Sequence, residues 1–536
     1  MFNVKASLAL LVIAFDLFAA TLASPVEWSE RRDSDDTCKK TKVAVLGAGC
    51  AGIFAAQALH NASINDFVII EYNGEIGGRV KHTTFGQQPN GDGPYTVELG
   101  ANWVQGLVSP DGPENPIWTL AKKWKLENKY SNYDNLSTFD ETGQSDYSHL
   151  IDDFLDSYTK FEQDAGLILT QNLQDRSART GFRLADWKPT HDSPKMQAVE
   201  WFEMDFEYAQ TPEQTSHTWA VINYNSTFYQ YSERNNFVFD QRGFSAFIIG
   251  EASTFLEDND PRLMLNTIVT DIEYSDSGVT VHNKDGSCVE ADYMICTFSI
   301  GVLQRDRINF QPKLPEWKQT GIDAMTMATY TKIFLQFPPD QVFWDTNTQF
   351  FLYADPYERG YYPIWQSLDT PGFQPGSGIL FVTVTQDQSF QVESQTEEMT
   401  KNQVMEVLRT MYGAENVPEP TAFMYPRWSK EPWAYGSYSN WPPGYTLEMH
   451  QNLRASLGNG RLWFAGEATS TEYFGFLHGA YAEGQSAGIA IAECINGNAT
   501  ACNSSPSYKM LHGTTRFGEY DVDNGWTNAT FETFGW

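Results

Sequence analysis

The chain has 536 residues, of which 41% are hydrophobic and 14% aromatic, enough material for two domains or for one large domain with insertions. Its formal net charge of -32 at pH 7 argues against nucleic acid and anionic membrane surfaces as partners, because the protein's field would repel phosphates. A small cationic molecule would be attracted instead.

The N-terminus has the pattern of a secretory signal peptide. Lys5 precedes a short apolar run that ends in small residues at Ala20 to Ser24. A membrane anchor is the less favoured alternative, because the run is short and Asp16 interrupts it. We expect residues 1–23 to be removed and the protein to be secreted, to the cell exterior or the cell wall, or alternatively sent to the vacuole.

Glycosylation sequons and cysteines fit an exported protein. Cys494 and Cys502 lie close together and predict a local disulfide, whereas Cys50 and Cys296 are expected to be buried thiols. No Cys/His spacing resembles a metal site. The Asn-X-Ser/Thr sequons begin at Asn61, Asn135, Asn225, Asn498, Asn503 and Asn528.

In chain order, the first elements predict a βαβ unit that binds a dinucleotide. The expected elements are a buried strand over 42–46, a tight turn over 47–52, a helix from 53 to 60 and a second strand over 67–71. In the turn, Gly47 permits a sharp bend, Gly49 lets the backbone approach a pyrophosphate and Gly52 lets the helix pack closely. Glu71 follows Gly52 by nineteen residues, close to the ~20 expected for the carboxylate that binds a ribose hydroxyl. These features do not separate NAD from FAD.

The later elements alternate between helical and strand patterns. Helices are predicted within 146–175 and in "TEEMTKNQVMEVLRTMYG". Between them, residues 262–298 are rich in strands, with turns at Ser277-Gly278 and Asp285-Gly286. Residues 505–536 are expected to form a C-terminal tail.

Three segments carry a resemblance to a known family. They are "EYNGEIGGRV", "VELGANWVQG" and "GRLWFAGEATSTEYFGFLHGAYAEGQSAG", and together they resemble the flavin-containing amine oxidase family. The resemblance implies noncovalent FAD, since no cysteine stands near "TEYFGF" to bind it covalently. It implies a mixed α/β and α+β fold, with a discontinuous Rossmann-like FAD-binding domain formed by 40–110, 240–310 and 455–500. Residues 111–239 and 311–454 would form a substrate-binding domain of mixed sheet and helices.

The same resemblance assigns the cofactor contacts. The Gly78-Arg79 segment would add contacts to the FAD phosphates, and Gly466 and Glu467 would meet the ribityl and phosphate region. The helix starting near His478 would direct its N-terminus at the flavin and stabilise the reduced, anionic ring. The full set of expected cofactor-binding residues is Gly47, Gly49, Gly52, Glu71, Gly78, Arg79, Asn102, Trp103, Val269, Trp428, Gly466, Glu467, Gly475 and Phe476.

Within that family, segments such as "DFEYAQTP", "YTKIFLQF" and "GSYSNWPPG" are most similar to secreted polyamine oxidases of the plant type. Strand alternation places Tyr330, Lys332 and Phe334 on one face. Lys332 matches a lysine that holds a water near flavin N5, and Glu207 matches a carboxylate of the substrate tunnel. The expected catalytic residues are Lys332, Glu207, Tyr330, Tyr438, Phe476, Tyr208, Gln105 and Trp103.

Two positions depart from that pattern. Gln105 stands where the secreted plant enzymes carry Glu, and Phe476 stands where they carry Tyr. The first change removes a negative charge from the tunnel, and the second removes a hydroxyl beside the flavin. Both weaken the transfer of spermine and spermidine as substrates, while the flavin chemistry is unaffected.

The resulting hypothesis is oxidation of a carbon next to a secondary amine of spermine, spermidine or an acetylated form. Hydride passes to flavin N5, water hydrolyses the iminium to an aldehyde and a smaller amine, and molecular oxygen reoxidises the flavin to give hydrogen peroxide. Alternatives are a monoamine oxidase, an L-amino-acid oxidase and a flavin-bound module without turnover. No nucleic acid or membrane is expected as a partner, and a monomer is favoured.

Overall fold

The computed structural model describes residues 38–89, 91–110, 112–502 and 506–513. The predicted signal peptide (1–23) and most of the predicted tail (505–536) lie outside these ranges. Among the described residues, no helix combines the length and the apolar character needed to cross a bilayer.

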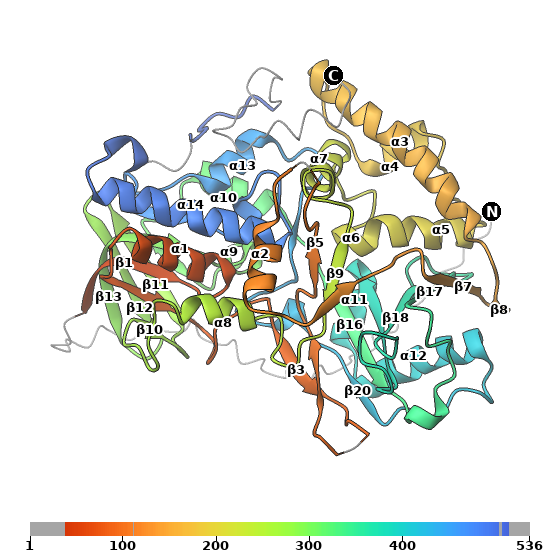
Figure 1. The fold of residues 1–536 in the computed structure, drawn as a ribbon. Coiled ribbons are helices and arrows are strands. Elements are labelled where there is room, and N and C mark those ends of the chain that lie inside the picture. The colour runs from red at the N-terminus through yellow and green to blue at the C-terminus, as the bar shows by residue number, and fades with distance from the viewer. Residues whose placement is uncertain (1–37, 90, 111, 503–505, 514–536) are drawn as a thin grey trace, which may run out of the picture. The chain divides into compact units, whose positions relative to one another are not determined.

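An eight-stranded mixed sheet contains the predicted βαβ unit (Figure 1). Its core is parallel, with β1 between β2 and β13, so that Leu46 pairs with Ile70 on one side and Cys296 on the other. The strand order is β10-β2-β1-β13-β12-β11-β14, and β22 also pairs with β13. The strands are β1 (Lys39–Leu46), β2 (Phe67–Ile70), β10 (Leu263–Met264), β11 (Val269–Ser275), β12 (Gly278–Asn283), β13 (Cys288–Cys296), β14 (Asn309–Gln311) and β22 (Leu462–Phe464).

The central strand β1 is buried on both faces, as expected for a parallel strand in the middle of a sheet. Val43 and Val45 pack in one hydrophobic cluster with α1 (Cys50–Asn61) and α14 (Leu477–Ile495), which lie side by side (Figure 1). Ala44 and Leu46 point the other way, into a cluster formed with β11, β12 and β22. The sequence therefore places the Gly-rich turn at the carboxyl end of a rigid strand.

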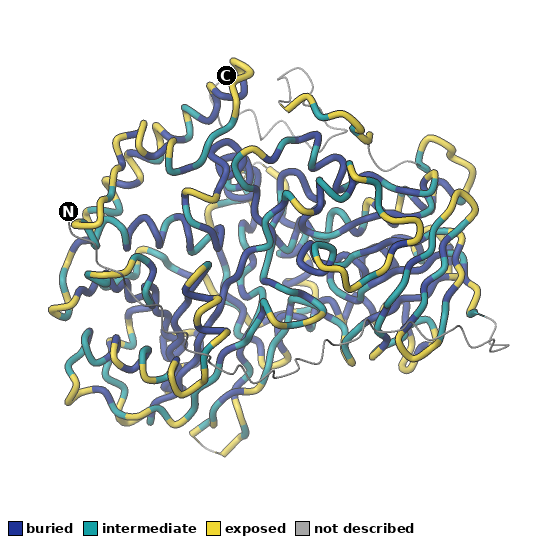
Figure 2. The backbone as a smooth tube through the Cα atoms, turned by 180° about the vertical axis from the view of Figure 1, so that it is seen from behind, coloured by how far each residue is buried: buried dark blue, intermediate teal, exposed yellow. Residues whose placement is uncertain are grey.

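A second sheet has seven strands in the order β20-β16-β19-β18-β17-β7-β8. On β16, Ile333 and Leu335 face one hydrophobic cluster, which also holds α12 (Glu397–Tyr412), and Phe334 faces another. Figure 2 shows the buried backbone running through the strands, with exposed residues on the loops and outer helix faces. The strands are β7 (Leu136–Asp140), β8 (Gly143–Gln144), β16 (Tyr330–Gln336), β17 (Phe350–Tyr353), β18 (Ile364–Ser367), β19 (Ile379–Thr385) and β20 (Ala422–Met424).

The described residues also form the smaller sheets β3-β4, β15-β21 and β5-β9-β6. In the sheet β5-β9-β6, β5 belongs to the predicted FAD-binding domain, whereas β9 and β6 belong to the predicted substrate-binding domain. The expected boundary at residue 110 therefore falls between strands that pair, and the assignment of each domain to cofactor or substrate stays a prediction. These strands are β3 (His82–Phe85), β4 (Tyr95–Glu98), β5 (Trp103–Gln105), β6 (Asn128–Tyr130), β9 (Asn235–Val238), β15 (Thr326–Met327) and β21 (Ser439–Asn440).

Both predicted long helices are present, as α3 (His149–Thr170) and α12, and the strand-rich stretch folds as β10 to β13. The other helices are α2 (Pro116–Lys123), α4 (Ala178–Leu184), α5 (Pro194–Glu200), α6 (Phe206–Tyr208), α7 (His217–Phe228), α8 (Ala246–Ala252), α9 (Ile300–Leu303), α10 (Glu316–Ala324), α11 (Gln386–Ser394) and α13 (Leu447–Arg454). One π-helical turn, η1 (Trp201–Asp205), and the 3-10 turns η2 (Pro339–Gln341), η3 (Trp428–Lys430), η4 (Glu467–Thr469) and η5 (Ala499–Cys502) complete the fold.

The cysteines are paired as predicted at one end of the chain. Cys494 and Cys502 form a disulfide, and Cys50 and Cys296 are buried thiols. A second disulfide, Cys38–Cys288, was not predicted. Its two cysteines lie 250 residues apart in sequence and meet only because β1 and β13 pair in the sheet.

Candidate active site

A cavity of about 710 Å³ is lined by residues of both large sheets and of the segments between them, a volume in the usual range for ligand sites. Two predicted residues, Gly52 and Lys332, do not line it. The predicted residues that do are Gly47, Gly49, Glu71, Gly78, Arg79, Asn102, Trp103, Gln105, Glu207, Tyr208, Val269, Tyr330, Trp428, Tyr438, Gly466, Glu467, Gly475 and Phe476.

One end of the cavity is formed by the Gly-rich turn and the start of α1. Gly49 is the N-cap of α1, and no side chain caps this helix end. The first amides of α1 therefore stay open to a ligand, and the helix dipole favours an anion there. Gly52 lies behind the turn, where a Cβ atom would overlap the carbonyl oxygen of Gly47. This is the close packing predicted for Gly52, although it gives no direct contact with the cavity.

The Glu71 carboxylate holds this turn in place. One oxygen accepts a hydrogen bond from the Ala48 backbone N–H at 2.7 Å, and the other accepts one from the Asn73 backbone N–H at 2.7 Å. Burial raises the pKa of Glu71, and these hydrogen bonds oppose that shift. The residue predicted for a ribose hydroxyl thus borders the cavity and also orders the turn.

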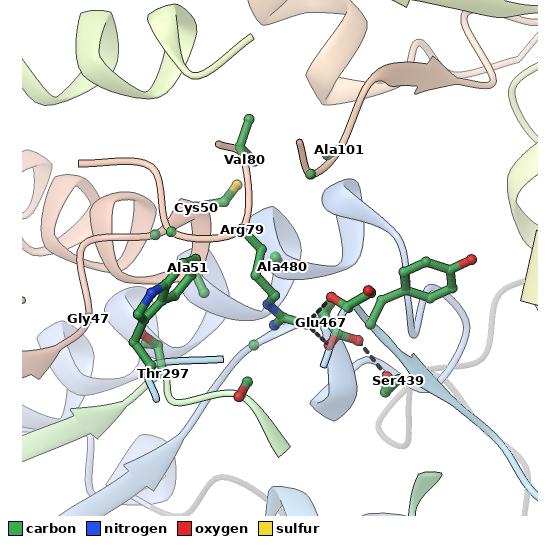
Figure 3. Close-up of a pocket in the computed structure, with 18 of the residues that line it drawn as sticks. Gly47, Cys50, Ala51, Arg79, Val80, Ala101, Thr297, Ser439, Glu467 and Ala480 are labelled. Atoms are coloured by element: carbon green, nitrogen blue, oxygen red, sulfur yellow. Dashed lines mark hydrogen bonds and ion pairs between the residues drawn. The ribbon is translucent and has the colours of Figure 1, made fainter. Parts of the chain in front are cut away.

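Arg79 and Glu467, which both line the cavity, form an ion pair (Figure 3). Arg79 Nη1 donates to Glu467 Oε1 at 2.7 Å and to the carbonyl oxygen of Ser437 at 3.0 Å. The other Glu467 oxygen accepts from Ser439 Oγ at 2.5 Å and from the Gly475 backbone N–H at 2.9 Å. This set joins the loop after β2, the strand β21 and the segment before α14.

The start of α14 presents a second helix N-terminus to the cavity. Phe476 is its N-cap, without a side-chain cap, and its ring stacks on the His478 ring at 5.0 Å between centroids. Burial lowers the pKa of His478 to about 3, so the imidazole stays neutral. The positive end of the helix dipole is therefore available to stabilise negative charge in the cavity.

Lys332 lies one layer behind the cavity wall. It is 1% exposed on β16, next to the edge strand β20, and its Nζ donates to the carbonyl oxygen of Gly100 at 2.9 Å and to Asn102 Oδ1 at 2.8 Å. Burial lowers the pKa of Lys332 and raises that of Glu98, while the attraction between the two opposes both shifts. Lys332 itself does not line the cavity, whereas Asn102 and Gly100, which accept its hydrogen bonds, do. Its assignment to a water near flavin N5 stays a prediction.

Glu207 and Gln105 face each other at the other end. Gln105 Nε2 donates to Glu207 Oε1 at 3.2 Å. Glu207 is half-buried, and its burial raises its pKa to about 7, which the hydrogen bond from Gln105 opposes. A carboxyl in this setting gains free energy from a cation placed beside it.

Aromatic rings enclose the cavity around Glu207. Tyr438 Oη donates to the Glu207 carbonyl oxygen at 2.8 Å, and its ring lies 6.0 Å from that of Tyr330. Phe206 and Tyr133 also line the cavity and were not predicted. Phe206 directly precedes Glu207 in the sequence, so it could have been predicted as a cavity residue together with Glu207. Tyr133 comes from the loop between β6 and β7, and no local pattern marks it.

The residues present fit an anionic dinucleotide with an aromatic ring system. The phosphates could be bound by the uncapped N-termini of α1 and α14, the Gly-rich turn and Arg79. The aromatic side chains around Glu207 suit a flat ring system. Among the described residues, no group of three or more His, Cys, Asp or Glu side chains could hold a metal ion.

Comparisons with known proteins identify the family of this chain. The family described as "Flavin containing amine oxidoreductase" matches residues 50–491. Polyamine oxidase 1 of Zea mays is 38% identical over 470 residues, covering 84% of this chain and 90% of that protein. Polyamine oxidase 7 of Oryza sativa subsp. japonica is 38% identical over 461 residues, covering 83% and 93%. A solved structure of a putrescine oxidase bound to putrescine has a TM-score of 0.66 at 17% identity, covering 86% of this chain and all of the other, a likeness of fold.

Proposed function

This chain belongs to the flavin-containing amine oxidoreductase family, and we propose that its substrates within that family are polyamines. It is an FAD-dependent amine oxidase, and the proposal concerns the amine and the bond that is oxidised. The substrate would be a polyamine such as spermine or spermidine, or an acetylated form. The products would be an aldehyde, a smaller amine and hydrogen peroxide.

The observation that carries the proposal is the position of Glu207. It is a half-buried carboxylate, surrounded by aromatic rings, in the same cavity as the Gly-rich turn and the N-terminus of α1. A remote ammonium group of a polyamine would pair with this carboxylate, and the alkyl chain would lie against Tyr330, Tyr438 and Phe206. A simple monoamine has no second ammonium group to use this site. The relatives named polyamine oxidases also support this choice of substrate.

FAD bound in this cavity would supply the redox chemistry, which is hydride transfer from the carbon next to the reacting nitrogen and electron transfer to molecular oxygen. The protein's own groups bind and align the substrate. The open amides of α1 and the Arg79 guanidinium would hold the phosphates, and the N-terminus of α14 would stabilise negative charge on the ring system. Lys332, through Asn102 and Gly100, would order the wall beside the reacting atoms.

Peroxide release by the purified, yellow protein tests this proposal. Spermine, spermidine, their N-acetyl forms, a monoamine and an amino acid are compared, and the products are identified by mass. Turnover of a polyamine with an aldehyde product supports the proposal, and the products show which side of the secondary nitrogen is cleaved. Turnover of the monoamine or the amino acid alone would refute it.

We infer further that the FAD is noncovalent and that the protein matures in an oxidising compartment. Both free cysteines among the described residues are buried thiols, and burial raises the pKa of the one that lines the cavity, Cys50. The two disulfides support export. Acid precipitation should leave the yellow colour in the supernatant, and a coloured pellet would contradict noncovalent binding.

A further inference from the structure

The segment that presents Glu207 to the cavity begins with an unusual turn. η1 (Trp201–Asp205) is π-helical, and the Phe206 backbone N–H donates to the carbonyl oxygen of Trp201, five residues earlier. A π turn contains one residue more than an α turn, so it changes the direction in which the following side chains point. The three residues that follow it, Phe206, Glu207 and Tyr208, all line the cavity. The direction of Glu207 therefore depends on the geometry of this turn.

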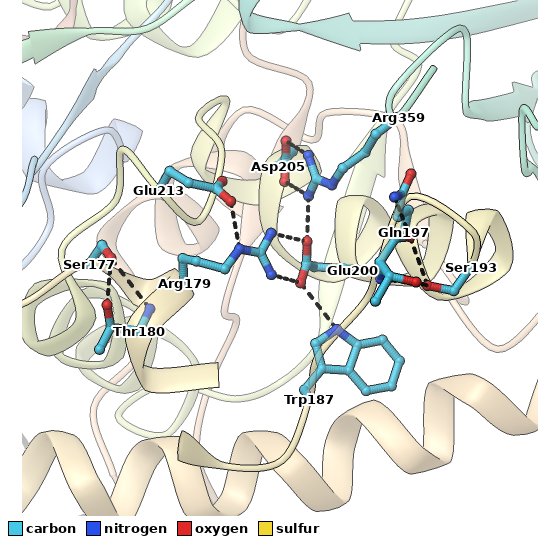
Figure 4. A network of polar contacts seen from close by, with 11 residues as sticks. Ser177, Arg179, Thr180, Trp187, Ser193, Gln197, Glu200, Asp205, Glu213 and Arg359 are labelled. Atoms are coloured by element: carbon cyan, nitrogen blue, oxygen red, sulfur yellow. Dashed lines mark hydrogen bonds and ion pairs between the residues drawn. The ribbon is translucent and has the colours of Figure 1, made fainter. Parts of the chain in front are cut away.

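Two buried carboxylates stand at the ends of the π turn. Glu200 immediately precedes it and is 0% exposed, and Asp205 ends it and is 1% exposed. Arg359 bridges the two (Figure 4): its Nη1 and Nη2 donate to the two Asp205 oxygens at 2.7 and 2.6 Å, and Nη2 lies 3.0 Å from Glu200 Oε1. One guanidinium thus contacts both ends of the turn.

A second arginine completes the network. Arg179 Nη1 and Nη2 donate to the two Glu200 oxygens at 2.5 Å each, and Arg179 Nε donates to Glu213 at 2.6 Å. The Trp187 indole N–H also donates to Glu200, at 3.1 Å (Figure 4). Every oxygen of Glu200 and Asp205 therefore has a charged partner.

The arginines come from different parts of the fold. Arg179 lies on α4, and Arg359 lies in the loop between β17 and β18 of the seven-stranded sheet. Gly360 follows it with φ +83, and a Cβ atom there would lie 2.8 Å from the Trp201 indole nitrogen. Glycine at this position lets the loop approach the turn. The network thus ties the turn to the sheet on one side and to a helix on the other.

The geometry of these pairs suits positioning better than stabilisation. Buried ion pairs add little net stability, because desolvation offsets the Coulomb attraction, but paired N–H···O bonds fix the relative orientation of two groups. Burial raises the pKa of Asp205 to about 6, and Arg359 opposes this shift. Replacing Arg359 would remove a charged partner from both Asp205 and Glu200 without changing any residue of the π turn itself.

We propose that Arg359 is a positioning residue for substrate binding, which holds the π turn by Asp205 and Glu200 and thereby points Glu207 into the cavity. The proposal rests on the proposed function, in which Glu207 binds a remote ammonium group. It predicts that Arg359 acts on affinity for multiply charged amines through Glu207, and not on FAD binding or on the oxidation step.

A double-mutant cycle with Arg359→Gln and Glu207→Gln tests this. Arg359→Gln should raise the KM for the best polyamine by about tenfold, the size expected for losing one hydrogen bond to a charged group, with kcat and FAD content nearly unchanged. In the Glu207→Gln background it should cause no further rise. Additive effects on KM, or a fall in kcat alone, would overturn the proposal.

A matched control is Arg262→Gln. The Arg262–Asp260 pair is of the same kind and similarly buried, with side chains 24% and 6% exposed, but neither residue lines the cavity. This variant should lower thermal stability and leave KM unchanged, and an equal rise in KM would mean that Arg359 acts only through stability. If Arg359→Gln does not fold, Asp205→Asn takes its place, because it weakens the same ion pair and keeps a hydrogen-bond acceptor. Its effect on KM should also be non-additive with that of Glu207→Gln. Additive effects would count against the proposal.

Calorimetric binding of a long aliphatic diamine to the holoenzyme separates the two hypotheses. Binding by the wild type that weakens about tenfold in Arg359→Gln supports the proposal. Equal binding by both overturns it and leaves the proposed function intact. No binding by the wild type would refute the proposed function, and the role of Arg359 with it.

Discussion

Gln105 Nε2 lies 3.2 Å from Glu207 Oε1 and donates a hydrogen bond to it. The amide thus occupies one lone pair of the carboxylate while adding no charge of its own. Among the described residues that line this end of the cavity, Glu207 is the carboxylate that a substrate would meet. Its partner Gln105 comes from β5, and its own segment follows the π turn.

Gln105→Glu should tighten the binding of multiply charged amines. A second carboxylate beside Glu207 adds attraction for an ammonium group, which for a partly exposed pair amounts to at most about 1 kcal/mol, or about fivefold in KM. The KM for spermine should fall at alkaline pH, and the KM for a monoamine should not change. A parallel fall for both amines would mean that the side chain acts on the cavity's shape and not through charge.

The pH dependence of KM should follow the ionisation of Glu207. Because burial raises its pKa to about 7, the carboxyl is largely neutral below that pH and attracts an ammonium group only above it. The KM for a polyamine should fall as pH rises through about 7, until the remote amines lose their own protons. In Glu207→Gln this fall should be absent and KM should stay high, as read from initial rates across that range. A variant that keeps the wild-type profile would assign the titration to another group.

Lys332→Met should slow catalysis. It removes both hydrogen bonds that hold Gly100 and Asn102 and leaves Glu98 without its opposite charge. We expect kcat to fall by about a hundredfold, in the range for loss of a group that positions a reacting proton or water. Rapid mixing, with flavin absorbance followed separately for reduction by amine and oxidation by oxygen, shows which step is affected.

Lys318→Met is the control for that variant. Lys318 is also a fully buried lysine, with Nζ donating to the carbonyl oxygens of Leu453 and Ala455 at 2.6 Å each, and it does not line the cavity. It should lower stability and leave the kcat of the folded enzyme unchanged. An equal loss of kcat in both variants would mean that Lys332 matters only for folding.

The two disulfides should contribute unequally to stability. In the chain-entropy picture, a bond closing 250 residues restricts the unfolded chain more than one closing eight, with upper values of about 5.5 and about 2.5 kcal/mol. Cys38→Ser/Cys288→Ser should therefore lower the unfolding temperature more than Cys494→Ser/Cys502→Ser, as read by calorimetry. The reverse order would show that the N-terminal strand is held by β-pairing alone.

Glycan occupancy should differ among the sequons. Asn225 is 0% exposed on α7 and its Nδ2 donates to Glu162 at 2.7 Å, whereas Asn61 is exposed. If the protein is exported through a glycosylating pathway, mass spectrometry of its peptides should find Asn61 modified and Asn225 bare. A glycan on Asn225 would contradict the packing of α7. Asn503 and Asn528 lie outside the described residues.

Local patterns sufficed for the dinucleotide end of the site. The turn from Gly47 to Gly52 and the carboxylate Glu71 lie within thirty residues of one another, so strand–turn–helix geometry alone places them together. The same holds for the disulfide between Cys494 and Cys502, where short separation makes contact almost unavoidable. The alternation in 330–336 likewise predicted which side chains share a face with Lys332.

The substrate end could not be read in this way, because its residues come from distant segments. Glu207 was identified through family resemblance. Arg179 and Arg359, which pair with the carboxylates at the ends of the π turn before Glu207, were not identified, because no short-range spacing links these arginines to the turn. Two further contacts depend on how segments far apart in the chain lie side by side. They are the hydrogen bond from Lys332 to Asn102 and the disulfide between Cys38 and Cys288. The family, the Gly-rich turn and the local helices and strands could be predicted from the sequence, because short motifs and neighbouring residues specify them. The ion pairs that hold the turn before Glu207, and the groups that Lys332 contacts, appear only in the folded chain, because burial and contacts between distant segments set the free energies of these charges.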